Sequence, residues 1–216
     1  MKLYGYFRSS AAYRVRIALG LKGIAWETVA VDLRAPVQAQ HSREFRALNP
    51  HGLIPVLIDG EHTLTQSLAI IEYLEETHPQ PPLLPPTPAG RAAVRALALA
   101  VACDIHPLNN SRVLEYLRNR LAQDEPAVSG WYAHWIAEGF AALERDARRL
   151  SGDGRHMYGS SVTLADVCMV PQMANARRVS CDLAPYPTLC AICQHLETLP
   201  AFVRAAPALQ PDASSA

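Results

Sequence analysis

Three consecutive residues near the N-terminus, Arg8, Ser9 and Ser10, combine a cation with two hydroxyl groups. They separate residues 2–7, which alternate as a half-buried strand does, from residues 13–21, whose apolar side chains recur at helical spacing. We therefore expect the serines at a helix N-terminus, where N–H groups and the helix dipole stabilise a phosphate, carboxylate or thiolate. Serine is also a common N-cap, so a purely structural role stays open, and the adjacent cation of Arg8 favours anion binding.

A second helix start with polar side chains follows at Gln66 and Ser67. Residues 68–75 carry apolar side chains at helical spacing, so we expect a helix to about residue 77 with Ser67 as its N-cap. The Gln66 amide and the N–H groups of this helix start suit a carboxylate, although a plain cap is the simpler reading of Ser67. The sequence thus predicts a second anion site in the same part of the chain.

A proline lies inside the apolar segment 53–60, which otherwise predicts a strand that turns back into an antiparallel partner over residues 61–65. Proline has no N–H to donate to a sheet, so it requires an edge, a strand start or a cis bond. We predict a cis peptide bond between Ile54 and Pro55 that leaves the backbone of Ile54 free to pair with an extended, peptide-like ligand.

Polar residues interrupt an otherwise apolar helical segment at residues 103–112. We expect His106 and Asn110 to share one helix face, with Arg112 beside them, and Pro107 to kink or restart the helix. So many polar groups in one turn cost stability unless they have partners, which favours a cleft over a packed core. A single histidine would more often be structural, and it is the clustering that favours a functional role.

Residues 79–88 contain six prolines in ten positions and can form neither a helix nor a central strand, so we place a linker there. Before it, the pattern of strand, helix, strand, weak helix, two strands and helix predicts an α/β domain over residues 1–78, whose first two strands are parallel. After it, residues 89–216 are expected to form an all-helical domain. Its helical patterns cover residues 91–120, 128–150, 164–178 and 188–196.

The composition excludes several classes of protein. Half of the 216 residues are hydrophobic, and 20 basic residues balance 20 acidic ones, so no overall field attracts nucleic acid or an anionic membrane. Arg8, Arg14 and Arg16 interrupt any apolar signal segment, and no apolar run is long enough to span a bilayer. We therefore expect a cytoplasmic protein.

Five cysteines, an odd number, indicate reduced thiols and no disulfide framework. Cys190 and Cys193 form a C-x-x-C pair, a spacing that also occurs in zinc and dithiol sites. They fall in the helical segment 188–196 without a second ligand pair, so we expect them to pack as small hydrophobic residues and predict no metal site. The pattern Thr163-x-x-Asp166 likewise predicts a capping box with a structural role.

This order of elements, with a strand proline, a Gln-Ser helix start, a proline-rich linker and a helical second half, resembles the cytosolic glutathione transferases, whose first domain is thioredoxin-like. Within that superfamily the sequence resembles the zeta class, the maleylacetoacetate isomerases. The matching segments are residues 8–19, 47–50, 66–74, 104–110, 170–172 and 210–212. One departure is Ala11, where many zeta-class enzymes have a cysteine, so any sulfur nucleophile must come from the cofactor.

The resemblance implies that glutathione is the cofactor and that Ser9, Ser10 and Arg8 are catalytic, with the serines facing the thiol. The residues that would bind glutathione are Gln40, Ile54, Pro55, Gln66, Ser67, Asp104, His106 and Asn110. The resemblance implies that some of the contacts of Gln40, Asp104, His106 and Asn110 come from the partner subunit of a homodimer. The arginines that would clamp a small dicarboxylate substrate are Arg8, Arg112 and Arg178, because guanidinium matches carboxylate bidentately.

The function implied is a glutathione-dependent cis-trans isomerisation of maleylacetoacetate to fumarylacetoacetate in tyrosine and phenylalanine catabolism. The thiolate would add to the cis double bond, allow rotation about the resulting single bond and leave again, so that glutathione is regenerated. The alternatives are a maleylpyruvate isomerase of gentisate-type degradation, a general glutathione-conjugating transferase and, from a different class, a non-catalytic binding module of the same fold. The intact serines and Arg8 argue against the last of these.

Overall fold

The structure is a computed structural model that describes residues 1–34 and 36–213, and it divides into two compact units. The first unit comprises Met1–Pro82 and Thr198–Ala216, and the second comprises Leu83–Glu197. The division after residue 82 falls inside the expected linker. The chain from residue 198 differs from the expectation, because it belongs to the first unit and not to the helical one; the last three residues lie outside the described part.

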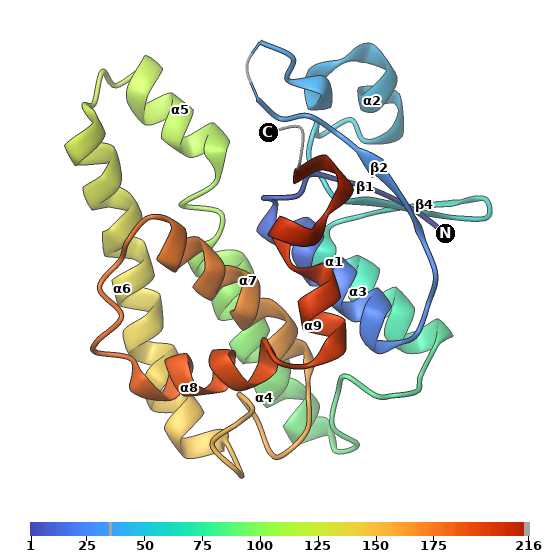
Figure 1. Cartoon of the computed structure of the whole chain (residues 1–216), viewed down its shortest axis with the longest axis vertical. Helices are drawn as coiled ribbons and strands as arrows, with labels where there is room; N and C mark the ends of the chain where they lie inside the picture. The colour runs from blue at the N-terminus through green and yellow to red at the C-terminus, as the bar shows by residue number, and fades with distance from the viewer. Residues whose placement is uncertain (35, 214–216) are drawn as a thin grey trace. The chain divides into compact units, whose positions relative to one another are not determined.

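A four-stranded mixed sheet in the order β2-β1-β3-β4 organises the first unit (Figure 1). Its strands are β1 (Lys2–Gly5), β2 (Glu27–Ala30), β3 (Val56–Asp59) and β4 (His62–Thr65). β1 runs parallel to β2 and antiparallel to β3, and β3 and β4 form an antiparallel hairpin. The parallel first pair and the hairpin confirm the predictions made from the sequence.

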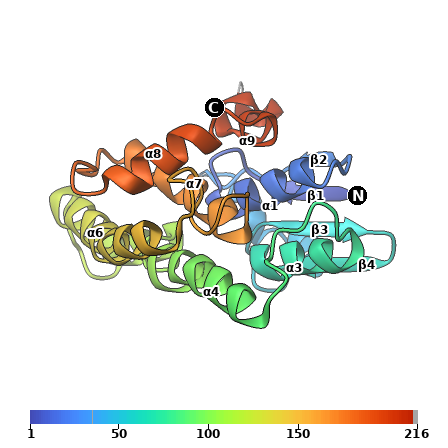
Figure 2. The same ribbon diagram turned by 90° about the horizontal axis from the view of Figure 1, so that it is seen from below.

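Side chains alternate between the two faces of this sheet, and each face has its own helices. Tyr4 and Val56 pack with Phe45 of α2 (Arg43–Leu48) on one face. On the other face Gly5 allows α1 (Ser10–Leu21) to approach so closely that a Cβ on this glycine would lie 3.2 Å from the Ala12 Cβ. α3 (Ser67–Thr77) packs beside α1, as Figures 1 and 2 both show.

A short helix near the C-terminus, α9 (Pro200–Ala205), completes the first unit by packing against α1. The two helices are in close contact at Gly20, where a Cβ would lie 3.4 Å from the Ala201 Cβ, an ordinary van der Waals distance. The Tyr13 hydroxyl donates to the Phe202 carbonyl at 3.5 Å, and the Arg16 Nε donates to the Ala205 carbonyl at 3.0 Å. Residues from one face of α1 thus hold the last α-helix of the chain.

The second unit consists of helices packed around α7 (Leu164–Arg178), which contacts both α4 (Pro88–Leu99) and α8 (Pro187–Leu196). α6 (Glu125–Leu150) is its longest helix and packs on α8 (Figure 2). The interior residues of α7 are almost fully buried. No helix in the described part of the chain is both long and apolar enough to cross a membrane.

The helical pattern predicted over residues 91–120 is divided in the structure. α4 passes into a π-helical segment, Ala100–Ile105, which ends at His106, and α5 (Ser111–Asn119) begins as a separate helix. Pro107 cannot donate the backbone hydrogen bond that a continuing helix needs, so the chain turns and restarts. The restart was one of the two expected effects of this proline.

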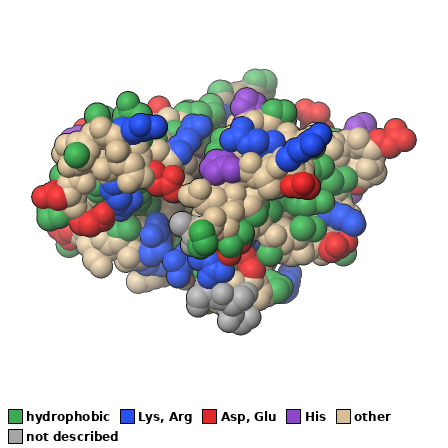
Figure 3. Space-filling view, turned by 90° about the horizontal axis from the view of Figure 1, so that it is seen from above, with side chains coloured by type: hydrophobic (Ala, Val, Ile, Leu, Met, Phe, Trp, Pro, Cys, Tyr) green, Lys and Arg blue, Asp and Glu red, His purple; other side chains and the backbone are tan. Residues whose placement is uncertain are grey.

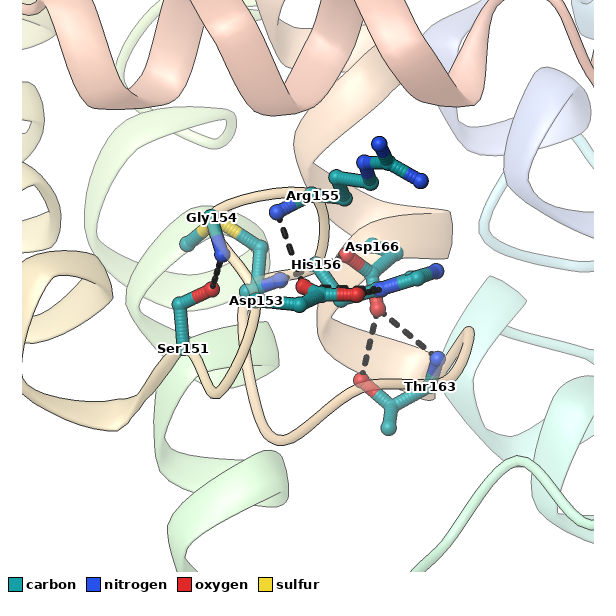
Figure 4. Close-up of polar contacts among 8 residues, drawn as sticks. Ser151, Asp153, Gly154, Arg155, His156, Thr163 and Asp166 are labelled. Atoms are coloured by element: carbon teal, nitrogen blue, oxygen red, sulfur yellow. Dashed lines mark hydrogen bonds and ion pairs between the residues drawn. The ribbon is translucent and has the colours of Figure 1, made fainter.

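The start of α7 is the predicted capping box, and it is closed by a buried carboxylate (Figure 4). Asp166 is fully buried; its Oδ2 accepts from the backbone N–H and the hydroxyl of Thr163 at 2.8 and 2.9 Å. Its Oδ1 accepts from the backbone N–H of Met157 at 2.7 Å. Burial raises the pKa of Asp166 to about 6, against the opposing effect of these hydrogen bonds and of His156.

The surface carries both signs of charge. On the face drawn in Figure 3, Lys and Arg side chains occur together with Asp and Glu side chains, and apolar side chains lie in groups between them. This mixture agrees with the zero net charge of the sequence. Charged recognition in this protein therefore depends on individual residues and not on an overall field.

Candidate active site

The strand register of the first unit brings three predicted site segments to the same end of the sheet. Val56 of β3 pairs with Tyr4 of β1 and with Thr65 of β4. The chain therefore leaves β1 toward Arg8–Ser10, enters β3 from Ile54–Pro55 and leaves β4 into Gln66–Ser67, all at the same end of the sheet. Residues that lie far apart in the sequence thus meet there because of the antiparallel pairing.

Ser9 is the N-cap of α1, and Ser10 is the first residue of the helix. The Ser9 Oγ accepts from the backbone N–H of Ala12 at 3.2 Å, which leaves its own hydrogen available for donation. Ser9 is half-buried, whereas Ser10 is only 6% exposed. Arg8 is exposed, and its guanidinium carbon lies 5.1 Å from the centre of the Phe7 ring. Of the two serines, Ser9 is the more accessible to a ligand.

Gln66 and Ser67 lie at the start of α3, but the N-cap residue differs from the one predicted. Gln66 occupies the N-cap position and Ser67 is the first helical residue, so Ser67 is not the N-cap. The reason is backbone geometry: Gln66 has φ 68° and ψ 115°, a conformation that residues with a Cβ rarely adopt. Such strained backbone clusters at functional sites, which is consistent with a binding role for Gln66.

The peptide bond between Ile54 and Pro55 is cis, as predicted. β3 begins only at Val56, so Ile54 lies just outside the hydrogen-bonded ladder. Gln40 lies close to this segment, because a Cβ on Gly52 would be 3.1 Å from the Gln40 carbonyl oxygen. The Gln40 Oε1 is buried and accepts no hydrogen bond from any described residue. A buried acceptor without a donor is costly, which makes Gln40 a candidate for ligand contact.

The predicted residues of the second unit form a group around the break after the π-helical segment. Asp104 is exposed, and His106 is half-buried at the end of that segment. Asn110 is the N-cap of α5 and accepts from the backbone N–H of Arg112 at 3.2 Å. The expectation that His106 and Asn110 share one helix face is wrong, because the turn after Pro107 separates them.

Tyr132 of α6 connects this group with the end of α7. Its hydroxyl accepts from Arg178 at 3.3 Å, and its carbonyl accepts from the side chain of Asn109 at 3.1 Å. Burial raises the pKa of Tyr132, so the phenol stays neutral. The neighbouring Arg177 is held by Glu197 at 2.6 and 2.8 Å. Of the two arginines that end α7, Arg177 thus forms an ion pair with a carboxylate, whereas the contact described for Arg178 is with a neutral phenol.

The cysteines show no sign of a metal or dithiol site within the described residues. All five are free thiols, and no group of three or more His, Cys, Asp and Glu side chains in this part of the chain could hold a metal ion. Cys190 and Cys193 lie in α8, where burial raises the pKa of both thiols. Cys193 is fully buried, as the sequence predicts, whereas Cys190 is only partly buried and its thiol donates to the Leu183 carbonyl at 3.8 Å.

Two buried arginines of α1, Arg14 and Arg16, were not singled out from the sequence. Arg14 is 1% exposed and donates to the Ser67 Oγ at 3.3 Å, which connects α1 with the start of α3. Arg16 is 2% exposed and donates to the Phe7 carbonyl at 3.1 Å. Two arginines in an otherwise apolar helix are a readable signal, because a buried charge requires a specific partner.

Comparison with known proteins gives consistent matches. Residues 3–82 match the family described as glutathione S-transferase, N-terminal domain. Over 211 residues the chain is 53% identical to a probable maleylacetoacetate isomerase of Vibrio cholerae serotype O1, which covers 98% of this chain and 97% of the relative.

Two solved structures are similar over nearly their whole length. A holo structure of maleyl pyruvate isomerase, described as a bacterial glutathione S-transferase of the zeta class, is 48% identical with a TM-score of 0.95 and covers 98% of this chain and 99% of its own. The maleylacetoacetate isomerase of Methylobacterium extorquens AM1, with bound malonate and glutathione, is 42% identical with a TM-score of 0.94 and covers 99% of each chain. Both share the two-part architecture of this protein.

Proposed function

Since the chain belongs to the zeta class of the glutathione transferases, we propose that it is a glutathione-dependent isomerase that converts maleylacetoacetate to fumarylacetoacetate. The observation that carries this proposal is the N-terminus of α1, where the half-exposed Ser9 and the exposed Arg8 lie at a helix start with no acidic residue in its first turn. Such a site stabilises a thiolate and attracts a carboxylate.

The polar groups of the first unit fit glutathione. Its γ-glutamyl carboxylate suits the start of α3, where Gln66 and Ser67 supply an amide, a hydroxyl and helix N–H groups. Its peptide backbone suits Ile54, which lies outside the ladder beside the cis bond to Pro55. The buried Oε1 of Gln40 accepts no hydrogen bond within the described residues and suits an N–H of the tripeptide.

When bound, glutathione supplies the thiolate that adds reversibly to the double bond. The protein's part is to lower the pKa of this thiol and to hold the two carboxylates of the substrate. Ser9 can donate its hydroxyl hydrogen to the sulfur while its oxygen accepts the N–H of Ala12, and this second bond polarises the hydroxyl. Arg8 offers a charge-assisted clamp for one carboxylate. No general base is required.

The test is an absorbance assay with both maleylacetoacetate and maleylpyruvate, each with and without glutathione. We expect turnover only with glutathione and a higher kcat/KM for maleylacetoacetate. A higher kcat/KM for maleylpyruvate would reassign the substrate, and the 48% identity to a maleylpyruvate isomerase makes this the second candidate. Conjugation without isomerisation would indicate a general transferase. Turnover of either diacid without glutathione would contradict the mechanism.

The clamp is tested by Arg8→Ala, with the exposed Arg145→Ala on α6 as a matched control. Loss of one charge-assisted contact costs about 2 kcal/mol, or roughly 30-fold in kcat/KM. We expect this loss for Arg8→Ala on both diacids and no loss for the control. An unchanged kcat/KM would remove Arg8 from the site.

For the second unit we propose glutathione contacts from Asp104, His106 and Asn110 and substrate contacts from Arg112 and Arg178. Their support is the family resemblance and, for Arg178, a guanidinium held only by a phenol at 3.3 Å among the contacts described above. Alanine variants separate the two groups. Substitution of a glutathione-binding residue should raise the KM for glutathione, and substitution of a substrate-binding arginine should raise the KM for the diacid.

We further propose a homodimer that acts in the cytoplasm, in the breakdown of tyrosine and phenylalanine. Five free thiols support a reducing compartment, and the family resemblance supports the dimer. Light scattering on a sizing column measures the mass of the assembly, where a value near twice 23.6 kDa is expected.

A further inference from the structure

The turn that carries Arg8 and Ser9 is held from outside by the C-terminal segment. The backbone N–H of Ser9 donates to the Tyr6 carbonyl at 2.9 Å, so Phe7 and Arg8 are the two central residues of a tight turn that leads directly into α1. β1 ends at Gly5, and the sheet therefore provides no ladder partner for Phe7. The conformation of this turn decides where the Ser9 hydroxyl lies.

The backbone N–H and carbonyl of Phe7 both have partners from other parts of the first unit. Its N–H donates to the Asp212 Oδ2 at 2.8 Å, across 205 residues of sequence. Its carbonyl accepts from Arg16 at 3.1 Å, and the same guanidinium donates to the last carbonyl of α9, that of Ala205, at 3.0 Å. One residue of the turn is thus fixed at both ends by a carboxylate and a buried guanidinium.

The C-terminal segment is itself anchored so that it can present this carboxylate. Gln210 is 8% exposed, and its amide donates to the carbonyls of Arg204 and Ala206, both at 2.9 Å. Burial lowers the pKa of Arg16 to about 10, while Tyr13 and Asp212 act in the opposite direction, so this guanidinium stays charged at neutral pH. The contacts form a continuous support from α9 to the turn.

We propose that Asp212 is a positioning residue, which holds the Phe7 peptide so that the Ser9 hydroxyl faces the glutathione thiol. This inference rests on the proposed role of Ser9. Asp212 does not touch the reacting atoms; it acts by restricting the turn. Without the carboxylate the Phe7 N–H loses its partner and the turn samples other conformations, so the thiolate is stabilised less. The C-terminal segment would thereby contribute to catalysis on the first unit.

The test compares Asp212→Ala, Asp212→Asn and the control Asp182→Ala, which removes an exposed carboxylate that accepts one backbone N–H, that of Ala184 at 3.0 Å. The absorbance of the glutathione thiolate in the complex is titrated to give its pKa. We expect Asp212→Ala to raise this pKa by about one and to lower kcat about tenfold, with a KM for glutathione within about twofold of the wild type. Asp212→Asn keeps an acceptor for the Phe7 N–H and should restore most of both.

Hydrogen exchange of the free protein gives a readout that does not depend on turnover. The amides of Phe7 and Ser9 should exchange faster in Asp212→Ala but not in Asp182→Ala, with the rest of the first unit unchanged. A lower melting temperature with an unaltered thiol pKa would reduce Asp212 to a structural residue and overturn the proposal. A failure of the asparagine variant to restore the pKa would also overturn it.

Ser9→Ala separates this inference from the proposed function. If Ser9→Ala raises the thiol pKa and Asp212→Ala does not, only the positioning role is wrong. If neither substitution changes the thiol pKa, the proposed site at α1 and the role of Asp212 both fail. If only Asp212→Ala changes it, the turn acts through a group other than Ser9, and both proposals are wrong as stated.

Discussion

Helices α1 and α7 both have a hydroxyl residue as N-cap, but only α7 has a carboxylate in its first turn. Each follows a hydroxyl residue, Ser9 or Thr163. At the third helical position α7 has Asp166, which is fully buried and accepts three hydrogen bonds, whereas α1 has Ala12 and no acidic residue in its first turn. One start is sealed by the protein's own carboxylate, and the other keeps its positive end for a ligand.

The difference shows what separates a structural helix cap from a binding site. The Asp166 carboxylate in the first turn of α7 accepts the N–H of the N-cap residue Thr163, and its negative charge opposes the positive end of the helix dipole, so an added anion would be repelled. A serine alone satisfies one N–H and leaves the rest of the dipole available. The identity of the third residue, Asp or Ala, therefore decides whether the helix start stabilises the fold or a bound anion.

The largest effect is expected from opening the sealed start with Asp166→Ala. Two buried N–H groups, of Met157 and Thr163, would lose their acceptor, and we expect a loss of about 3 to 5 kcal/mol in the free energy of unfolding. Chemical denaturation measures it, with the exposed Asp182→Ala as a control that should lose less than about 1 kcal/mol. A loss as small as that of the control would mean that the box does not stabilise α7.

The next effect is a pH dependence of the free energy of unfolding, which arises from Asp166 at the start of α7. The pKa of Asp166 is about 6 in the folded protein against an ordinary value of 3.8, so the folded state binds this proton more tightly. Its contribution to stability is complete only well below pH 3.8 and is lost as the pH rises through 6, a total change of about 3 kcal/mol.

Asp166→Asn cannot titrate and isolates this contribution. We expect the stability of the wild type minus that of the variant to fall by about 2 kcal/mol between pH 4 and 7, measured by denaturation at each pH. Other titrating groups are common to both proteins and cancel in the difference. A difference that rises with pH would show that the hydrogen bonds to the carboxylate outweigh its burial.

The third effect concerns the open start and appears in catalysis. Ser9→Ala removes the proposed donor to the thiolate, and we expect kcat/KM to fall about 10- to 100-fold, which corresponds to about 1.4 to 2.7 kcal/mol. Ser10 is buried at the first helical position, so Ser10→Ala should cost less. The reverse order would assign the thiol to Ser10. Steady-state assays over a range of glutathione concentrations distinguish the two outcomes.

The sequence predicted the parts of this comparison that depend on local interactions. The Thr163-x-x-Asp166 pattern predicted the start of α7, and the proline before β3 predicted the cis bond. Both depend on residues within a few positions of each other, where spacing alone determines the contact.

Contacts between distant segments could not be predicted in this way. The Asp212 carboxylate reaches Phe7 across 205 residues, and α9 packs against a helix at the other end of the chain. Nothing in the local pattern of either segment encodes the partner. The face shared by His106 and Asn110 was wrongly predicted because a π-helical segment and Pro107 end the regular helical repeat. The sequence thus predicted which residue types stand at the helix starts of the candidate site. It did not predict the contacts from α9 and Asp212 that hold these residues in place.

The smallest effect provides the sharpest contrast between the two helix starts. Thr163→Ala removes the hydroxyl that donates to Asp166 and caps the N–H of the third helical residue. It leaves the carboxylate with both backbone N–H groups, so we expect a loss of only about 1 kcal/mol in stability. Ser9→Ala removes an N-cap and should cost about the same. If the two starts differ in function as proposed, two variants of equal stability will differ at least tenfold in kcat/KM, with Thr163→Ala close to the wild type. Equal activities would show that the hydroxyl of Ser9 is only a cap.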